Sequence, residues 1–201
     1  MKLTWLGHAC FLLEQDGYRI ATDLYTGVEG YPDPHVSVHE VYCSHQHADH
    51  NAIDRAEILP KADSPFTVQA VETFHDGQKG ALRGPNTVRI FEAGGTRAVH
   101  LGDLGHLLSP EQTAAIGPVD ALMIPVGGFY TIGPAEAKQV CDALHPRCIL
   151  PMHYRHAPYG LPNVGGVEDF LALYSEFRRL DGPALELDAS ACGVLVPAYQ
   201  P

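Results

Sequence analysis

Short apolar runs separated by turn signals mark the first part of the chain and predict strands. These runs cover residues 3–6, 11–14 and 18–23. The pair Asp16-Gly17 is typical of a tight hairpin turn, because glycine accepts the positive φ that such a turn needs. Residues 25–39 are rich in glycine and proline and are predicted to form a loop. We therefore expect the chain to begin with an antiparallel meander.

The rest of the chain alternates between strand patterns and helix patterns. Strands are predicted at residues 66–74, 87–91, 97–101, 120–126, 148–152, 184–187 and 193–196. Helices are predicted at residues 52–59, from Ser109 onward, at 133–144 and, from an apolar stripe at helical spacing, at 167–180. This order predicts one α/β domain over residues 1–201, a four-layer αββα sandwich of two mixed β-sheets flanked by helices.

One short stretch concentrates metal-binding residue types. His45, His47, Asp49 and His50 lie within six residues, directly after an apolar strand pattern. A strand that ends and releases its side chains into a loop is a common place for a site. In extended backbone His45 and His47 point the same way and can hold one metal ion, whereas Asp49 and His50 follow a turn and can face a second. The spacing H-x-H-x-D-H therefore predicts a two-metal site.

Charge and cysteine content narrow the partners and the compartment. The 201 residues carry a formal net charge of −11, which argues against nucleic acid or an anionic membrane as a partner, because either needs basic patches. A small-molecule substrate, even an anionic one, stays open, since bound metal ions supply positive charge locally. Five cysteines without a C-x-x-C pair, and no apolar run of membrane-spanning length, predict reduced thiols and a cytoplasmic protein.

A two-metal site needs a further histidine for each metal and a carboxylate that bridges them. The distant candidates are His75, His100, Asp103 and His153, each at or near the end of a predicted strand. On a strand through residues 98–103, His100 and Asp103 would point to opposite faces. If Asp103 faces the metals, we therefore expect His75 as the third histidine of the first metal, with His100 in the core or beside the ligands.

The motif set resembles the metal signature of the metallo-β-lactamase superfamily. The resemblance rests on the H-x-H-x-D-H run, His75, Gly102-Asp103 and His153. The runs Trp5-Leu6-Gly7-His8 and Pro151-Met152-His153-Tyr154 resemble its small metal-dependent hydrolase branch, which includes ascorbate-phosphate lactonase-like proteins. One run departs from the family pattern, because Thr73-Phe74-His75-Asp76 stands where threonine-proline-glycine-histidine is usual.

The resemblance implies an αββα sandwich with a dinuclear centre, usually of Zn²⁺ and sometimes of manganese or iron. By position it implies that His45, His47 and His75 hold one metal ion. It implies that Asp49, His50 and His153 hold the other, and that Asp103 bridges the two.

These residues allow a hydrolytic mechanism. A hydroxide bound to two divalent metal ions exists at neutral pH, and it can attack an electrophilic carbonyl or phosphorus. Asp49 would orient the attacking water or carry its proton. His8, in a tight turn, and His106, just past the bridging aspartate, are expected at the mouth of the site, where either could orient the substrate or protonate a leaving group.

Three further residues are candidate substrate contacts. Arg83 and Asn86 lie in a glycine-rich loop that could close over the pocket, and Arg83 could grip a carboxylate or phosphate at two points. Tyr130 follows a predicted buried strand and could donate a hydrogen bond to an oxyanion.

The leading interpretation is a metal-dependent hydrolase of a small-molecule lactone, amide or phosphoester. The alternatives are a dinuclear-iron oxidoreductase on the same scaffold and a non-catalytic metal-binding protein. The intact set of histidines argues against the iron enzyme, which tends to replace one histidine by a carboxylate. The charge of −11 and the lack of the extra domain of nucleic-acid-cleaving members argue against a nuclease.

Overall fold

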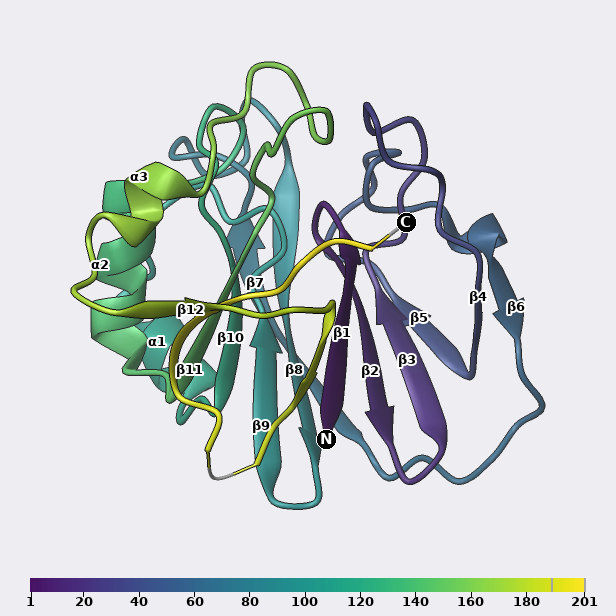
Figure 1. Cartoon of the computed structure of the whole chain (residues 1–201). Coiled ribbons are helices and arrows are strands. Elements are labelled where there is room, and N and C mark those ends of the chain that lie inside the picture. The colour runs from purple at the N-terminus through teal and green to yellow at the C-terminus, as the bar shows by residue number, and fades with distance from the viewer. Residues whose placement is uncertain (189, 201) are drawn as a thin grey trace.

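Two β-sheets pack face to face in the computed structural model of the protein, which describes residues 1–188 and 190–200 (Figure 1). The first sheet has five strands in the order β13-β1-β2-β3-β5, and the second has seven in the order β12-β14-β11-β10-β9-β8-β7. The strands of the first sheet are β1 (Lys2–Gly7), β2 (Cys10–Gln15), β3 (Tyr18–Thr22), β5 (Glu40–Tyr42) and β13 (Ala184–Glu186). Those of the second are β7 (Thr67–Phe74), β8 (Pro85–Ala93), β9 (Thr96–His100), β10 (Ala121–Pro125), β11 (Cys148–Met152), β12 (Phe177–Arg179) and β14 (Gly193–Val196).

Two-residue turns close the predicted hairpins. Asp16 and Gly17, at φ 51° and 81°, join β2 to β3, and Gly94 and Gly95, at φ 56° and 73°, join β8 to β9. A two-residue turn in which both residues have positive φ matches the twist of the strands it joins. The predicted meander and the predicted later hairpin are thus both confirmed.

The main core lies between the two sheets. Leu3 and Trp5 of β1 belong to the same buried cluster as Ile90 of β8 and Leu122 of β10. Every residue of β10 and of β11 is buried. Parallel strands covered on both faces have this continuous apolar character, which is why the sequence pattern predicts both strands correctly.

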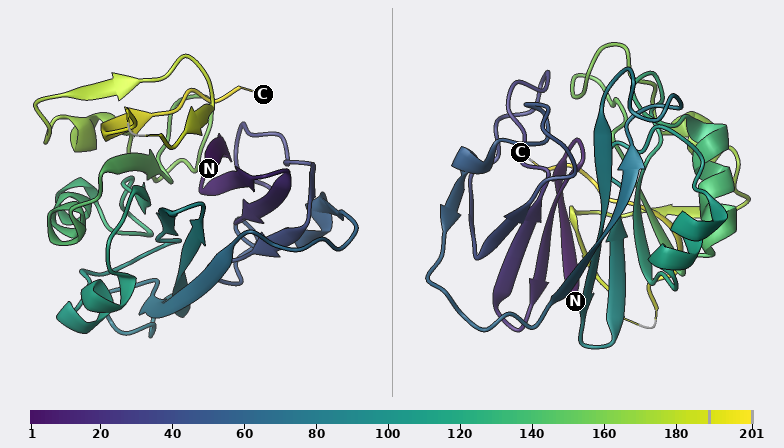
Figure 2. Two further views of the ribbon diagram at one scale, coloured as in Figure 1. Left: turned by 90° about the horizontal axis from the view of Figure 1, so that it is seen from below. Right: turned by 180° about the vertical axis from the view of Figure 1, so that it is seen from behind.

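The helices cover the outer face of the seven-stranded sheet (Figures 1 and 2). They are α1 (Pro110–Ile116), α2 (Pro134–Leu144) and α3 (Glu168–Leu171). The first begins as predicted, because the Ser109 hydroxyl accepts the backbone N–H of Gln112 while the Gln112 side chain accepts the backbone N–H of Ser109. None of the helices that the structure describes has the length and apolar character needed to cross a bilayer.

A different layer covers the outer face of the five-stranded sheet. It contains the paired short strands β4 (Val36–Val38) and β6 (Ala56–Ile58), the 3₁₀ turn η1 (Ile53–Arg55) and the loop after β3 (Figure 2). A second, smaller apolar cluster, which includes Ala21, Tyr25 and Val38, fills the space beneath. The α/β sandwich is confirmed, but in the described part of the chain its fourth layer is built from short strands and loops.

The helix predicted at residues 52–59 and the uninterrupted loop predicted at 25–39 are both wrong. The first is η1 followed by β6, and the second contains β4. No residue of η1 is buried, so a longer helix here would have no apolar face to pack against a neighbour. The backbone of β6 instead pairs with that of β4 in parallel.

The helix predicted at residues 167–180 is wrong beyond Leu171. Phe170 and Leu171 are buried, but Leu173 and Phe177 are 44% and 47% exposed, so the apolar stripe does not face the core along its whole length. The chain turns instead and adds β12 to the edge of the sheet beside β14. Backbone pairing at this edge overrides the helical pattern.

Strand direction gathers many strand ends at one end of the sandwich. In the five-stranded sheet β1, β3 and β5 run the same way, and in the seven-stranded sheet β7, β9, β10 and β11 run the same way. The loops that follow these strands meet at the end drawn uppermost in Figure 1.

Candidate metal centre

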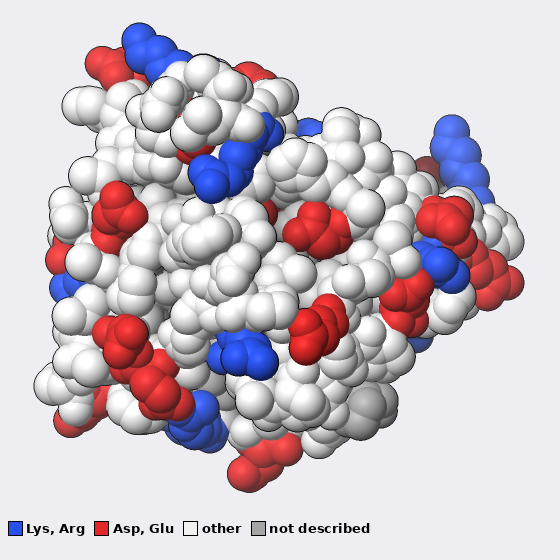
Figure 3. Space-filling model, turned by 90° about the horizontal axis from the view of Figure 1, so that it is seen from above, with Lys and Arg blue, Asp and Glu red and all other residues white. Residues whose placement is uncertain are grey.

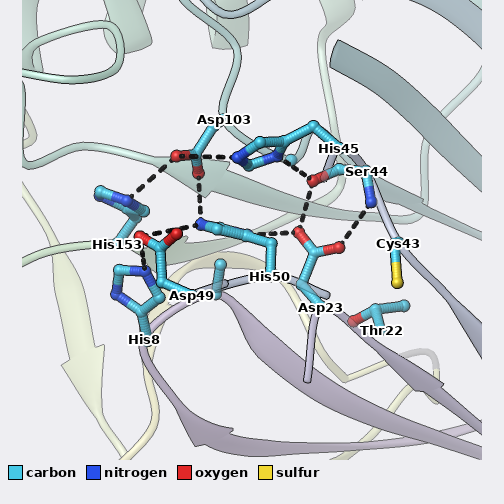
Figure 4. A network of polar contacts seen from close by, with 12 residues as sticks. His8, Thr22, Asp23, Cys43, Ser44, His45, Asp49, His50, Asp103 and His153 are labelled. Atoms are coloured by element: carbon cyan, nitrogen blue, oxygen red, sulfur yellow. Dashed lines mark hydrogen bonds and ion pairs between the residues drawn. The ribbon is translucent and has the colours of Figure 1, made fainter. Parts of the chain in front are cut away.

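The predicted ligands follow the C-terminal ends of strands from both sheets. The run from His45 to His50 follows β5, and His75, Asp103 and His153 follow β7, β9 and β11. The structure brings all seven side chains into one cluster, most of which Figure 4 shows. These strand ends place the ligands along one edge of the sandwich.

The carboxylate of Asp103 lies at the centre of this cluster. Its Oδ2 is 3.1 Å from His75 Nε2 and 3.2 Å from His153 Nε2. Its Oδ1 is 3.2 Å from His50 Nε2, while His45 Nε2 lies 4.0 Å from Oδ2. Asp103 itself is 1% exposed. A buried carboxylate approached from several sides by imidazoles has the geometry of a bridging ligand.

The donor atoms fall into two neighbouring groups, within each of which they lie no more than 4.8 Å apart. One group is His45, His47 and His75, and the other is His8, Asp49, His50 and His153. A third set at the same spacing, His45, His50 and Asp103, connects the two groups. Two metal ions side by side fit this arrangement, and the grouping matches the one that the sequence resemblance implies, except for the addition of His8.

The expectation that His8 lies at the mouth of the site is wrong. Its side chain is 2% exposed, and its Nε2 faces Asp49 Oδ2 at 3.5 Å. Its ring lies 4.2 Å from that of His153, and its backbone carbonyl accepts the N–H of His153. The left-handed backbone of His8, at φ 49°, turns the side chain inward from the tight connection between β1 and β2.

Asp23 supports two of the histidines from behind and was missed by sequence reasoning. Its Oδ2 lies 2.8 Å from His50 Nδ1. It also accepts the N–H of Ser44 at 2.7 Å, and the Ser44 hydroxyl lies 2.9 Å from His45 Nδ1 (Figure 4). Such a carboxylate fixes the orientation of the rings that it binds. The available signal was positional, because Asp23 directly follows β3 just as the ligands follow their strands.

The charges of the cluster depend strongly on one another. Burial raises the pKa of the Asp103 carboxyl, but the neighbouring His153 and His50 outweigh it and hold that pKa well below its ordinary value. Burial lowers the pKa of His50, but Asp103 and Asp23 outweigh it and raise that pKa. For His45, burial and then the neighbouring His50 outweigh the opposing effect of Asp103 and Asp23, and they lower its pKa to about 3.

Close packing around Gly102 fixes the position of Asp103. Asn86 takes part in this packing and has a different role from the one expected. Gly102 has φ 57°, and a Cβ there would lie 2.4 Å from both Asn86 Oδ1 and Ser44 Cβ. Asn86 is fully buried, so the expectation that it contacts substrate is wrong. Its Oδ1 accepts the Asp103 N–H at 2.9 Å, and its Nδ2 donates to Thr73 Oγ1 and to the Leu101 carbonyl. Asn86 therefore holds the backbone that carries Asp103.

His100 lies outside the cluster, as expected, but the reason given for that expectation, a strand through residues 98–103, is wrong. The strand predicted through residues 98–103 ends at His100, so Asp103 does not lie on it. His100 Nε2 lies 2.8 Å from the Ala9 carbonyl, and its Nδ1 accepts the N–H of Gly102. With both ring nitrogens bound to backbone, His100 ties β9 to the connection between β1 and β2.

His106 is also committed to backbone, which corrects the expectation of a catalytic role. Its Nε2 accepts the N–H of Phe74 at 3.1 Å, and its Nδ1 lies 2.7 Å from the Leu107 carbonyl. Neither nitrogen is free to protonate a leaving group. The ring instead fixes the end of β7 immediately before His75.

A cavity of about 400 Å³ opens onto the cluster. Its lining includes the ligand residues His47, Asp49, His75 and Asp103, together with Arg83, Tyr130 and Leu161. Two of the three expected substrate contacts, Arg83 and Tyr130, thus lie on the cavity wall. Burial raises the pKa of Cys43, in the same loop as the ligands, to about 12, so its thiol stays protonated at neutral pH.

The residues present fit a pair of divalent cations. Among the described residues, several buried atoms of the cluster have no hydrogen-bond partner: His8 Nε2, His45 Nε2, His50 Nε2, His153 Nε2 and Asp103 Oδ1. Each such atom costs about 1–3 kcal/mol if it stays unpaired. Imidazole nitrogens and carboxylate oxygens are ligands of Zn²⁺, so metal ions would satisfy atoms that the protein leaves unsatisfied.

Comparison with known proteins decides the family. A family profile described as a beta-lactamase superfamily domain matches residues 2–153. One similar solved structure comes from Thermotoga maritima and is described as a Zn-dependent hydrolase of the metallo-β-lactamase superfamily. Its sequence is 38% identical, the TM-score is 0.78, and the alignment covers 99% of this chain and 99% of that one. The chain belongs to the metallo-β-lactamase superfamily.

Two curated relatives are also similar to this chain. A UPF0173 protein of Pyrococcus furiosus is 32% identical over 183 residues, which cover 77% of this chain and 83% of the relative. A UPF0173 metal-dependent hydrolase of Carboxydothermus hydrogenoformans is 26% identical, and the alignment covers 84% of this chain and 91% of the relative. The protein is accordingly a metal-dependent hydrolase, whereas the narrower likeness to ascorbate-phosphate lactonases stays a prediction.

Proposed function

We propose that this hydrolase cleaves a lactone, amide or phosphoester bond in a small molecule by means of two divalent metal ions. The observation that carries the proposal is the convergence of imidazoles from both sheets on the buried Asp103 carboxylate, beneath an open cavity. Structural metal sites are closed by their ligands, whereas catalytic sites keep a face open to substrate.

The seven predicted side chains would hold the metal ions. In this proposal His45, His47 and His75 would hold one ion and Asp49, His50 and His153 the other, with the Asp103 carboxylate available to both. Nitrogen-rich ligand sets of this kind favour Zn²⁺ over Mg²⁺ or Ca²⁺, and Mn²⁺ or Fe²⁺ are the alternatives. The ions would supply Lewis acidity and lower the pKa of water towards neutrality.

The protein's own groups would orient the reactants. Asp49, with 27% of its side chain exposed, reaches the cavity and is placed to accept a proton from the attacking water. His8 Nε2 lies 3.5 Å from Asp49 Oδ2, so a positive charge on His8 would favour the ionised form of Asp49. Tyr130, also on the cavity wall, would donate a hydrogen bond to the oxygen on which charge develops.

The cavity and the surface support a small-molecule substrate rather than a polymer. A volume of about 400 Å³ suits a ligand of moderate size. On the face seen from above, lysines and arginines are scattered among acidic residues and do not gather into a basic patch (Figure 3). On this face the mixed charges support a small molecule rather than a polymer as substrate, and five free cysteines support a cytoplasmic protein.

Metal analysis of the purified protein tests the proposal. We expect two zinc ions per chain and turnover of at least one member of a chromogenic ester, lactone and phosphodiester panel. A chelator should abolish that turnover, and added zinc should restore it. His47→Ala should lose metal and at least about 100-fold in turnover, more than the loss typical of residues behind the ligands.

A matched control uses the exposed His35. His35→Ala should keep both the metal content and the turnover of the wild type, since it lies outside the cluster. Full metal content and full turnover in His47→Ala would contradict the proposal. Iron accompanied by redox activity would favour the dinuclear-iron oxidoreductase instead.

A further inference from the structure

Arg83 stands between the metal-site cavity and a second cavity. The second, of about 340 Å³, shares Arg83 and His47 with the first and is lined by the loop after β5 and by residues of β7 and β8. Glu72 and Arg89 both line this second cavity, so its wall carries charges of both signs. The metal-site cavity is also lined by charges of both signs, because Asp49 and Asp103 share its wall with Arg83, which is its one lysine or arginine among the described residues. With the proposed metal ions offsetting those carboxylates, an anionic group would be favoured on the metal side of Arg83.

The guanidinium of Arg83 is held in position by neighbouring groups, but no carboxylate pairs with its charge. Its Nη2 donates to the Phe129 carbonyl at 3.3 Å, and its Cζ lies 5.7 Å from the centre of the Tyr130 ring. Within the described part of the chain, no carboxylate lies within 4.0 Å of it. A guanidinium has five N–H donors in a fixed fork, so most of them remain available to a ligand.

Asp76 organises the loop that carries Arg83. Its side chain accepts four backbone N–H groups, those of Gln78 at 2.7 Å, Gly80 at 3.0 Å, Leu82 at 3.0 Å and Arg83 at 2.8 Å. Each carboxylate oxygen takes two of these bonds. Asp76 directly follows His75, so this one residue fixes the position of the Arg83 backbone relative to a metal ligand.

We propose that Arg83 is the anion-binding residue of the substrate site and that Asp76 is its positioning residue. The proposal rests on the proposed hydrolase function and narrows its substrate class. The substrate carries a carboxylate or phosphate group next to the bond that is cleaved, and the fork of Arg83 binds this group in two-point fashion. A loop already folded around Asp76 keeps the entropic cost of ordering Arg83 low when substrate binds.

A matched pair of ester substrates tests the role of Arg83. Mono(4-nitrophenyl) succinate carries a carboxylate, and 4-nitrophenyl butyrate is its neutral counterpart. Arg83→Gln should lower kcat/KM for the anionic ester by about 10- to 100-fold, mainly through KM, which corresponds to the loss of a hydrogen bond to a charged group. The neutral ester should change by less than about threefold, and Arg83→Lys should recover only part of the loss.

The control is Lys79→Gln, which removes one positive charge from the same loop. Lys79 is exposed and lines neither cavity, so both esters should react as with the wild type. Equal losses on the two esters in Arg83→Gln, or an equal loss in Lys79→Gln, would overturn the proposal.

A second measurement does not depend on turnover. Glutarate and propyl phosphate, titrated calorimetrically into the zinc-loaded protein, should bind at least about tenfold more weakly to Arg83→Gln than to Lys79→Gln or the wild type. Whichever of the two ligands binds with the higher affinity shows whether the anionic group of the substrate is a carboxylate or a phosphate. The function proposed above fails if no member of the ester, lactone and phosphodiester panel is hydrolysed, and this titration then still decides the role of Arg83. Equal affinities in all three proteins would reject that role.

The positioning role of Asp76 has its own readout. Asp76→Asn replaces one acceptor oxygen by a donor that faces backbone N–H groups, so the loop should loosen. Trypsin should then cut after Lys79 or Arg83 at least about tenfold faster than in the wild type, and the KM for the anionic ester should rise while the neutral ester changes little. An unaltered cleavage rate, or a loop that loosens without any change in that KM, would reject the positioning role.

Discussion

At the scale of single residues, the site depends on side chains that bind no ligand of their own. Asp23, Asn86 and Asp76 each orient a group in or beside the metal cluster, and none is a predicted ligand. The role of Asn86 could not be inferred from the sequence, because the fold alone brings it to Asp103. Asp23 was marked only by its place after a strand, and Asp76 acts on a loop whose shape no local pattern predicts. His45, His47, Asp49 and His50 could be recognised because their spacing is local.

Asp23→Asn should weaken metal binding about 10- to 100-fold, because it removes the charge that orients His50 directly and His45 through Ser44. Competition against a chromophoric zinc chelator measures the change. Asp63→Asn, in an exposed segment, is the matched control and should bind metal as the wild type does. An affinity unaltered in Asp23→Asn would show that Asp23 does not support the centre.

His8 should make the metal-free protein sensitive to acid. Burial, followed by the neighbouring His153, lowers the pKa of His8 from 6.5 to about 4. Below pH 6.5 the unfolded chain binds a proton that the folded chain does not, so the stability present above pH 6.5 is lost as the pH falls. Between pH 6.5 and 5 this loss is about 2 kcal/mol. Denaturant unfolding with a chelator present should show a shallower pH dependence in His8→Gln, and an identical slope would contradict the argument.

At the scale of elements, two glycines with the same kind of backbone should respond differently to alanine. Gly102 and Gly95 both have positive φ, but a Cβ at Gly102 would collide with Asn86 and Ser44, whereas nothing lies within 4 Å at Gly95. We expect Gly102→Ala to lower the free energy of unfolding by roughly 2–4 kcal/mol and Gly95→Ala by about 1 kcal/mol. Denaturant unfolding of the two variants side by side measures this, and equal losses would show that the close packing does not matter.

The elements themselves were predictable where one signal dominated. β10 and β11 could be predicted because their residues are continuously apolar, and α1 because Ser109 and Gln112 cap it. The helix expected through residue 180 could not be corrected from sequence, because Phe177–Arg179 owes its strand conformation to β14. Elements determined by distant backbone pairing leave no local pattern.

At the scale of the whole molecule, the metal ions should contribute to the stability of the fold. Neither sheet alone supplies all the ligands, since the run from His45 to His50 extends from one sheet and His75, Asp103 and His153 extend from the other. Each ion at 100 times its dissociation constant adds about 2.7 kcal/mol. For a chain of this size, chelation should therefore lower the melting temperature by roughly 10 °C or more.

Differential scanning calorimetry with and without chelator checks this expectation. Asp103→Asn should melt at one temperature under both conditions, because its centre has lost the bridging group. An equal melting temperature of the wild type with and without chelator would mean that the stability of the fold does not depend on the ions.

The exposed, irregular segment at residues 61–64 has a consequence for how the molecule could be divided. A break there would leave His45, His47, Asp49 and His50 on one fragment and the remaining predicted ligands on the other. Neither fragment could then assemble the complete set of ligands, so metal uptake would report that the two pieces had come together again.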